Sequence, residues 1–382
     1  VDIDLAASDA IANGMAFFEE ARQDMAQITT PISWLHGRFD AWMNLARVQT
    51  LLGVGEQSGR KLMVVPTGHQ LRSSAEALEV FQLVASEVGR LALGKKLDPR
   101  LPDLRTLKER SAAERRRLPD VALNRREFWR DYLLGRNGQL GIELMTSTGA
   151  YAELMKQQIE LLAINPGDSV VDLGSGTGSF LAALLESSDV PGEICVHEVD
   201  YVSAALTRTR VRFAERLSPL RVRTSYVSAD LELLRKNPRI PFADQSQSAV
   251  IASLLVSYVQ RPEALIGEVF RVLKPGGRFV ISALRPDADT SRIFVEGSEE
   301  LRRGRASEVF GSMEAATLEE SLRSFLNDAA RLLELEEKGI FRFWPEEEMA
   351  ALLRQGGFRA IRLQSAFGTP PQAIVAAAQR PL

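Results

Sequence analysis

The chain has 382 residues, of which 45% are hydrophobic and 25% charged, as in ordinary globular proteins that bury a core. Its 47 basic and 50 acidic residues leave a formal net charge of −3, so no overall basicity indicates a nucleic-acid partner. The single cysteine excludes an internal disulfide, and the sequence has neither a signal peptide nor an apolar run near the ~20 residues of a membrane span, so we expect a cytoplasmic protein without membrane contact.

The first part of the chain predicts two strands and a long helix. After a helical pattern over Ile11–Ala26, the segment Pro31–Trp42 indicates a strand that ends in a Gly/Asp loop. A second strand, within Lys61–Leu71, ends in Gly68 and His69, and Ser74–Leu93 has its apolar residues at helical spacing.

This order of strand, Asp loop, strand, His loop and helix is typical of the end of an α/β-hydrolase. Residues 29–93 resemble that terminal part, and the resemblance is nearest to acyl-transferring and thioesterase-like members. It implies that Asp40 is the acid and His69 the general base of a catalytic triad. The alternative is an aspartate that caps a turn and a histidine at the surface.

The sequence contains no G-x-S-x-G motif and does not begin with methionine. An Asp–His pair without a nucleophile cannot transfer an acyl group. We therefore expect residues 1–93 to be a partial α/β-hydrolase-like segment, which lacks its nucleophile. Its expected partners are an upstream hydrolase domain or, in a homodimer, a second copy of the chain.

Residues 94–130 are predicted to be a charged linker with one short helix at Leu107–Arg117. Acidic residues alternate with the arginines of Arg115–Arg117, and no aromatic residues are interleaved, so a solvated face is favoured over nucleic-acid binding. The following stretch, Phe128–Gln158, has helical spacing in pieces and leads into the next domain, which we place at 131–382.

The centre of that domain is the sequence VVDLGSGTGSF, Val170–Phe180. A strand over Ser169–Leu173 is followed by Gly174, Gly176 and Gly178 and then by a helical pattern, which indicates a tight turn at a helix N-terminus. A dinucleotide loop needs its third glycine at position 179, which is Ser179, so the G-x-G-x-G spacing disfavours that cofactor.

Strands and helices alternate after this turn, as in a doubly wound parallel sheet. The second strand, Glu193–Val199, ends at Asp200, where a carboxylate can accept hydrogen bonds from both hydroxyls of a ribose or, alternatively, cap the next helix. Asp230 follows the third strand, Arg221–Ser228. A fourth strand is predicted at Ser248–Leu255, and RVLKPGG leads through a turn into a fifth at Leu273–Ser282.

The glycine loop, Asp200, Asp230 and the Pro-Gly-Gly turn together resemble the class I S-adenosylmethionine-dependent methyltransferases, most strongly over residues 145–285. The resemblance implies an α/β, Rossmann-like fold with S-adenosyl-L-methionine as cofactor and no metal. It also implies that Asp172 orders the loop, that Gly174, Gly176 and Gly178 give backbone access, and that Asp200 and Asp230 bind ribose and adenine.

The catalytic group is not evident. Many relatives carry a histidine after the fourth strand, and here Ser257 and Tyr258 stand at that place as weak candidates. Tyr151 is a further candidate for contacting the carboxylate end of the cofactor. His197, inside a strand, is expected to be a packed core histidine.

Residues 286–345 form an expected helical insertion, with helices at Ser298–Phe310 and Thr317–Glu337. Its position above the carboxyl edge of the sheet and its terminal aromatics Phe341, Phe343 and Trp344 favour a substrate lid, although packing alone is an alternative. The helix Glu346–Gln355 and an antiparallel hairpin, Phe358–Phe367 with Gln372–Gln379, are expected to close the sheet.

We expect methyl transfer to a small-molecule acceptor, for which acyl or polyketide-like molecules are candidates. The acceptor atom (oxygen, nitrogen or carbon) cannot be read from the sequence. The alternative is an acyl hydrolase or acyltransferase fusion in which the C-terminal domain only binds the nucleoside cofactor.

Overall fold

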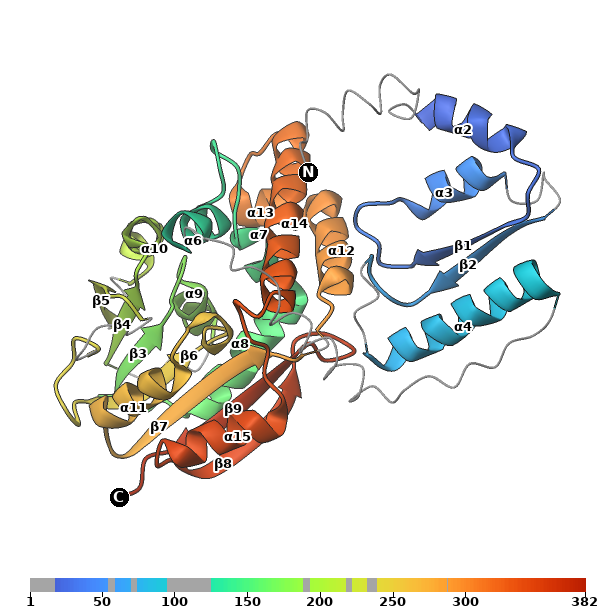
Figure 1. Cartoon of the computed structure of the whole chain (residues 1–382). Coiled ribbons are helices and arrows are strands. Elements are labelled where there is room, and N and C mark those ends of the chain that lie inside the picture. The colour runs from blue at the N-terminus through green and yellow to red at the C-terminus, as the bar shows by residue number, and fades with distance from the viewer. Residues whose placement is uncertain are drawn as a thin grey trace. The chain divides into compact units, whose positions relative to one another are not determined.

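A computed structural model describes residues 18–53, 59–69, 74–94, 125–187, 193–217, 222–231, 239–286 and 288–382. The chain divides into two compact units, residues 1–108 with 289–295 and residues 109–288 with 296–382 (Figure 1). None of the helices in the described ranges has the length and apolar character needed to cross a membrane. The predicted helix at Leu107–Arg117 and the start of Ile11–Ala26 lie outside those ranges.

The larger unit is built on a seven-stranded sheet with the order β5-β4-β3-β6-β7-β9-β8. Its strands are β3 (Ser169–Leu173), β4 (Ile194–Asp200), β5 (Val222–Ser228), β6 (Gln247–Ala252), β7 (Leu273–Leu284), β8 (Arg359–Ala366) and β9 (Ala373–Gln379). Neighbours among β3 to β7 pair in parallel, whereas β9 is antiparallel to both β7 and β8. The predicted doubly wound sheet with a closing hairpin is therefore confirmed.

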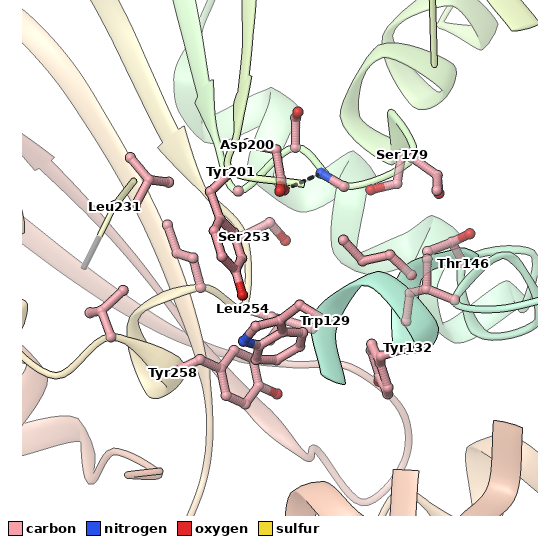
Figure 2. A pocket seen from close by; sticks show the side chains of 18 of the residues that line it. Trp129, Tyr132, Thr146, Ser179, Asp200, Tyr201, Leu231, Ser253, Leu254 and Tyr258 are labelled. Atoms are coloured by element: carbon pink, nitrogen blue, oxygen red, sulfur yellow. Dashed lines mark hydrogen bonds between the residues drawn. The ribbon is translucent and has the colours of Figure 1, made fainter. Parts of the chain in front are cut away.

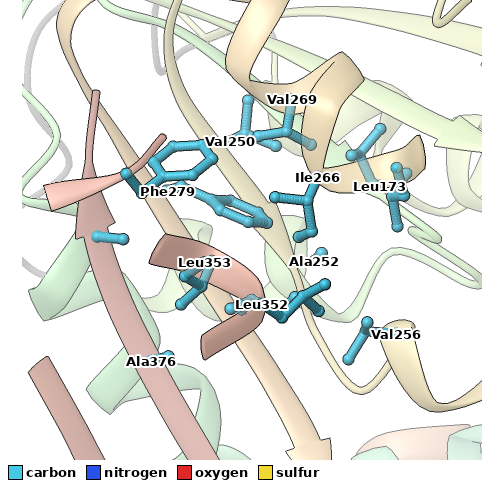
Figure 3. Close-up of a cluster of buried hydrophobic side chains, with 14 of the residues drawn as sticks. Leu173, Val250, Ala252, Val256, Ile266, Val269, Phe279, Leu352, Leu353 and Ala376 are labelled. Atoms are coloured by element: carbon cyan, nitrogen blue, oxygen red, sulfur yellow. The ribbon is translucent and has the colours of Figure 1, made fainter. Parts of the chain in front are cut away.

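Helices cover both faces of this sheet (Figure 1). They include α8 (Gly149–Leu162), α9 (Ser179–Glu186), α10 (Ser203–Leu217), α11 (Pro262–Val272) and α15 (Glu346–Gln355). The other helical elements of this part are α6 (Arg125–Leu134), α7 (Glu143–Thr146) and η2 (Val256–Tyr258). Alternate residues of a strand face opposite sides, so Val171 and Leu173 join α11 and α15 in one buried cluster, whereas Asp172 faces the other side (Figure 3). Because the central strands are covered on both faces, they are rich in valine and isoleucine, and the polar side chains of β3 and β4 include the buried acids Asp172 and Glu198.

Two boundaries differ from the prediction. The fourth strand was expected to continue to Leu255, but β6 ends at Ala252 and the chain turns through Leu254, which has a positive φ of 51°. The expected Pro-Gly-Gly turn lies inside the long strand β7, beside a register shift between Gln247 and Ala249 of β6. The turn at Leu254 ends β6 early, and the register shift changes the pairing of β6 with β7 without separating the two strands.

The insertion between β7 and α15 is helical, as predicted. It contains α12 (Ser291–Glu300), the π-helical turn η3 (Leu301–Arg305), α13 (Ala306–Phe310) and α14 (Ala315–Glu337). Helix α14 packs on α6, and ion pairing of Arg136 with Asp328 at 2.6 Å joins the loop after α6 to α14.

The smaller unit contains α2 (Phe18–Gln27), β1 (Ile32–Gly37), α3 (Leu45–Leu52), β2 (Arg60–Val65) and α4 (Ser74–Leu93). Strands β1 and β2 are parallel, with Ile32 opposite Arg60. Glu87 of α4 accepts hydrogen bonds from Ser33 of β1 at 2.9 Å and from Lys61 of β2, which fixes the helix on the strands. Hydrogen bonds from Lys61 and then Arg90 lower the pKa of Glu87 to about 2.

Candidate active site

A cavity of about 390 Å³ opens in the larger unit beyond the carboxyl ends of β3, β4, β5 and β6. Open parallel sheets bind their ligands at this edge, and the volume lies in the range of small-molecule sites. Figure 2 shows Asp200 and Ser179 at one end of the pocket and Trp129, Tyr132 and Tyr258 at the other. The pocket thus has an acidic end, where polar groups and backbone meet, and an aromatic end.

The glycine loop forms one wall of the acidic end. Gly174 and Gly176 line the pocket, and their φ values of 73° and 54° are in the region that favours glycine. Gly178 has a different role, because a Cβ there would lie 2.5 Å from Thr209 Cγ2. Its lack of a side chain permits the close approach of α9 to α10, and its expected role toward the cofactor stays a prediction.

Asp200, which the sequence analysis predicts to bind the ribose of the cofactor, lines the pocket. It is only 6% exposed, and its two carboxylate oxygens accept hydrogen bonds from Gly176 N at 2.9 Å and Val202 N at 2.8 Å. A carboxylate has about four lone-pair sites, so acceptor capacity remains for hydroxyl donors. Burial raises the pKa of Asp200, and the two backbone hydrogen bonds oppose that rise.

Asp230 also lines the pocket, after β5, as predicted. Asp172 does not appear among the described lining residues. It is 3% exposed and lies opposite Glu198 in the β3–β4 register. Burial, and secondarily the charge of Asp200, raises the pKa of Asp172 to about 8. Its expected role toward the cofactor stays a prediction.

Glu198 is a buried acid that the sequence analysis missed. It is fully buried inside β4, and burial followed by repulsion from Asp172 raises its pKa far above the ordinary value. Its position two residues before Asp200 on the same strand places it on the same face, which was a usable signal.

The aromatic end comes from α6 and η2. The Trp129 and Tyr258 ring centroids are 4.9 Å apart, and the Tyr132 ring also faces the cavity. Sequence analysis missed Trp129 because residues up to 130 were assigned to the linker, whereas α6 begins at Arg125. The spacing of Phe128, Trp129 and Tyr132 on one helix was the available signal.

The expected lid over residues 286–345 stays a prediction. No residue of 286–345 is among the described residues that line the pocket. Phe341 instead packs behind the wall, with its ring centroid 5.7 Å from Trp129 and 5.1 Å from Tyr258. The insertion supports the aromatic wall from outside because its apolar residues are used in packing against α6 and η2.

Of the two catalytic candidates, only Tyr258 faces the pocket. Ser257 is 1% exposed and is absent from the described lining residues. Burial raises the pKa of Tyr258, which favours the protonated phenol at neutral pH, and its expected catalytic role stays a prediction. Tyr151 reaches the acidic end, where its hydroxyl lies 3.2 Å from Ser179 Oγ.

His197 is half-buried inside β4 rather than packed in the core, and it is absent from the described residues that line the pocket. Its ring nitrogens lie 3.0 Å from Ser169 Oγ and 2.6 Å from Ser225 Oγ, and burial lowers its pKa. It therefore has no access to the pocket chemistry.

The smaller unit brings Asp40 and His69 together, as predicted from the two strand ends. Asp40 Oδ2 lies 2.7 Å from His69 Nδ1, and its other oxygen accepts from the backbone N–H groups of Trp42 and Met43. The Trp42 ring packs on the imidazole at 5.3 Å between centroids. A carboxylate fixed in this way orients an imidazole whose second nitrogen can bind a proton.

The pocket residues fit S-adenosylmethionine. The backbone of Gly174 and Gly176 borders the pocket directly, and Asp200 and Asp230 present acceptors for ribose hydroxyls and an amino group. The N-terminus of α9, which begins at Ser179, faces the same space and favours a carboxylate.

Comparison with known proteins agrees with this fit. Residues 171–281 match the family described as "Methyltransferase domain". The malonyl-[acyl-carrier protein] O-methyltransferase of Marinomonas sp. is 35% identical over 142 residues, 36% of this chain and 47% of that protein. The biotin biosynthesis bifunctional protein BioHC of Teredinibacter turnerae is 32% identical over 123 residues, 32% of this chain and 20% of that protein.

A demethylmenaquinone methyltransferase of Beutenbergia cavernae is 28% identical over 214 residues, 55% of this chain and 73% of that protein. The solved S-adenosylmethionine-dependent methyltransferase of Aquifex aeolicus has a TM-score of 0.37 and 13% identity, over 60% of this chain and 90% of that one. The chain spans about half the length of the Marinomonas relative and a fifth of BioHC. The family match and the curated relatives support the methyltransferase resemblance, and the hydrolase-like segment stays a prediction.

Proposed function

We propose that this S-adenosylmethionine-dependent methyltransferase transfers its methyl group to a small molecule with an apolar body. The observation that carries the proposal is one continuous cavity with an acidic end at Asp200 and Asp230 and an aromatic end at Trp129, Tyr132 and Tyr258. The names of two relatives mention a malonyl-[acyl-carrier protein] and demethylmenaquinone, so acyl and aromatic acceptors are the first to test.

In this proposal each end of the cavity has its own task. The bound cofactor supplies an electrophilic methyl group on a sulfonium. Asp200 accepts from the ribose hydroxyls, Asp230 from the adenine amino group, and the glycine loop allows the backbone to approach. Trp129 and Tyr258 exclude water and hold the acceptor beside the methyl group, since proximity and orientation supply much of the rate of such displacements.

A binding experiment separates the two ends. We expect S-adenosylhomocysteine to bind in calorimetry, and Trp129→Ala to leave that affinity within about threefold while methyl transfer from radiolabelled S-adenosylmethionine falls strongly. Arg130→Gln is the matched control, because Arg130 lies on the same helix, is 55% exposed and is absent from the described lining residues. A chain that binds neither S-adenosylhomocysteine nor S-adenosylmethionine would contradict the proposed function.

For the smaller unit we propose that Asp40 and His69 are the general-base part of an acyl-transfer site whose nucleophile is absent from this sequence. The support is the 2.7 Å contact between the two side chains and the lack of a G-x-S-x-G motif. We expect the chain to hydrolyse p-nitrophenyl acetate no faster than its His69→Gln variant. Hydrolysis that disappears in His69→Gln would show that the site is complete.

A further inference from the structure

The aromatic end of the pocket offers no general base to an acceptor. Among the described lining residues there is no histidine, lysine or cysteine, and the carboxylates are Asp200 and Asp230 at the acidic end. Apart from two arginines, the remaining ionisable side chains among them are tyrosines, and burial raises the pKa of Tyr132 as well as that of Tyr258. A group that removes a proton efficiently has a pKa near the working pH, which these phenols do not have.

Two arginines stand at this end of the pocket, and they are the only cationic side chains among the described lining residues. Arg125 Nη1 donates to the Tyr258 carbonyl at 3.0 Å, and its guanidinium carbon lies 5.4 Å from the Phe341 ring centroid. The Arg126 guanidinium carbon lies 5.5 Å from the ring centroid of Tyr201, which also lines the pocket. The Arg125 guanidinium therefore lies against Phe341, behind the aromatic wall, and that of the adjacent Arg126 lies against Tyr201 of the pocket.

We infer that the acceptor is a carboxylic acid with an apolar body, bound as its carboxylate by Arg125 and Arg126 and methylated on a carboxylate oxygen. This inference rests on the proposed function. A guanidinium pairs with a carboxylate through a planar fork of N–H donors, so one oxygen can be held while the other presents a lone pair. The apolar body then occupies the space between Trp129 and Tyr132.

This acceptor removes the need for a base. A carboxylate oxygen forms a bond to the methyl carbon while the carbon–sulfur bond breaks, and the electron pair of that bond stays on sulfur. A sulfonium and a carboxylate become a thioether and an ester, so charge balances and no proton is transferred. The ester also loses the charge that the arginines recognise, which favours release of the product over the substrate.

The probes are 4-phenylbutyrate, its primary amide and its methyl ester, titrated by calorimetry into the protein saturated with S-adenosylhomocysteine. We expect the carboxylate to bind at least tenfold more tightly than the amide or ester. Arg126→Gln and Arg125→Gln should each weaken carboxylate binding about 10- to 150-fold, the range for loss of a charge-assisted hydrogen bond, and leave amide binding unchanged. Arg126→Glu should weaken it further.

Arg130→Gln is the matched control, because Arg130 lies on the same helix, is 55% exposed and pairs with Asp131 outside the described pocket lining. Equal binding of acid and amide, or arginine variants that behave like Arg130→Gln, would overturn the inference. So would methyl transfer to phenols or amines under conditions where the acid is not methylated. In each of these cases S-adenosylhomocysteine still binds, whereas its failure to bind would reject the proposed function itself.

Discussion

Asp200 has two tasks in this site, and Asp200→Asn separates them. In the protein without cofactor, its carboxylate holds the glycine loop through Gly176 N and the start of α10 through Val202 N. Asparagine has nearly the same shape, but it keeps only one acceptor oxygen and turns an amide NH₂ toward one of these donors. The substitution thus removes one charge-assisted hydrogen bond and places two donors together.

The expected loss of stability is modest. A hydrogen bond to a charged group contributes about 1.5–3 kcal/mol, and the variant also avoids the burial of a charge in a site where burial already raises the pKa of Asp200. We expect the free energy of unfolding to fall by about 1–2 kcal/mol. For a domain of this size that lowers the melting temperature by about 2–8 °C.

Asp200→Asn should also weaken cofactor binding, and this loss of affinity is measured independently of the loss of stability. Ribose hydroxyls that donate to a carboxylate would donate to a neutral amide oxygen, which weakens binding about 10- to 150-fold. Calorimetry with S-adenosylhomocysteine, well below the melting temperature, measures this term alone. Asp230→Asn should weaken binding with little change in melting temperature, and Asp244→Asn, whose side chain is 64% exposed, is the control for both.

The result that would refute the reasoning is a lower melting temperature with unchanged affinity in Asp200→Asn. Asp200 would then be only the anchor of the loop, and the nucleoside would be recognised elsewhere in the pocket.

Three further predictions concern the rest of the molecule. The pKa of Asp172 is about 8 in the folded chain against an ordinary 3.8, so between these pH values the folded chain holds a proton that the unfolded chain has released. The free energy of unfolding therefore falls as pH rises from 3.8 to 8. In urea unfolding at about pH 6 and about pH 8.5, Asp172→Asn should make this fall smaller. Gly178→Ala should lower the free energy of unfolding by about 1–3 kcal/mol. Adding Thr209→Ser removes the methyl group that lies 2.5 Å from the new Cβ, so it should restore part of this loss in thermal melts, and no recovery would contradict a steric cause. In hydrogen exchange of the full chain, residues 18–94 should exchange before 169–284, because Phe81 and Val88 of α4 are 52% and 54% exposed; equal protection would contradict this.

The parts of the site that depend on local chemistry were predictable from the sequence. Three glycines at alternate positions after a buried strand require a tight turn, and the structure has positive φ at all three. Parallel strands bring their carboxyl ends to one edge, so Asp200 and Asp230 meet at the glycine loop and Asp40 meets His69. These positions follow from strand order and from the period of two, without knowledge of how the helices pack.

The acceptor end depends on packing between distant segments, and that is where the sequence misled. The aromatic run at Phe341 suggested a lid, but aromatic residues are as well suited to a buried core, and only the tertiary arrangement decides between the two uses. The wall itself comes from Trp129, on a helix whose first residues continue an arginine-rich stretch. The charge of that stretch indicated a solvated linker. The periodic pattern of the helix shows which residues share a face, but it does not show what that face contacts.

The same ambiguity explains why Arg125 and Arg126 carry information in the structure that they lack in the sequence. In the sequence they are two more cations in a charged stretch. In the structure each guanidinium lies near an aromatic ring, Phe341 for Arg125 and Tyr201 for Arg126, at the end of the cavity that holds no base. Arg125 is half-buried and Arg126 is exposed, and both line the cavity, where a guanidinium can pair with a carboxylate through its planar fork of N–H donors. The selectivity of this enzyme for its acceptor is therefore expected to lie in α6 and not in the insertion that its position above the sheet first suggested.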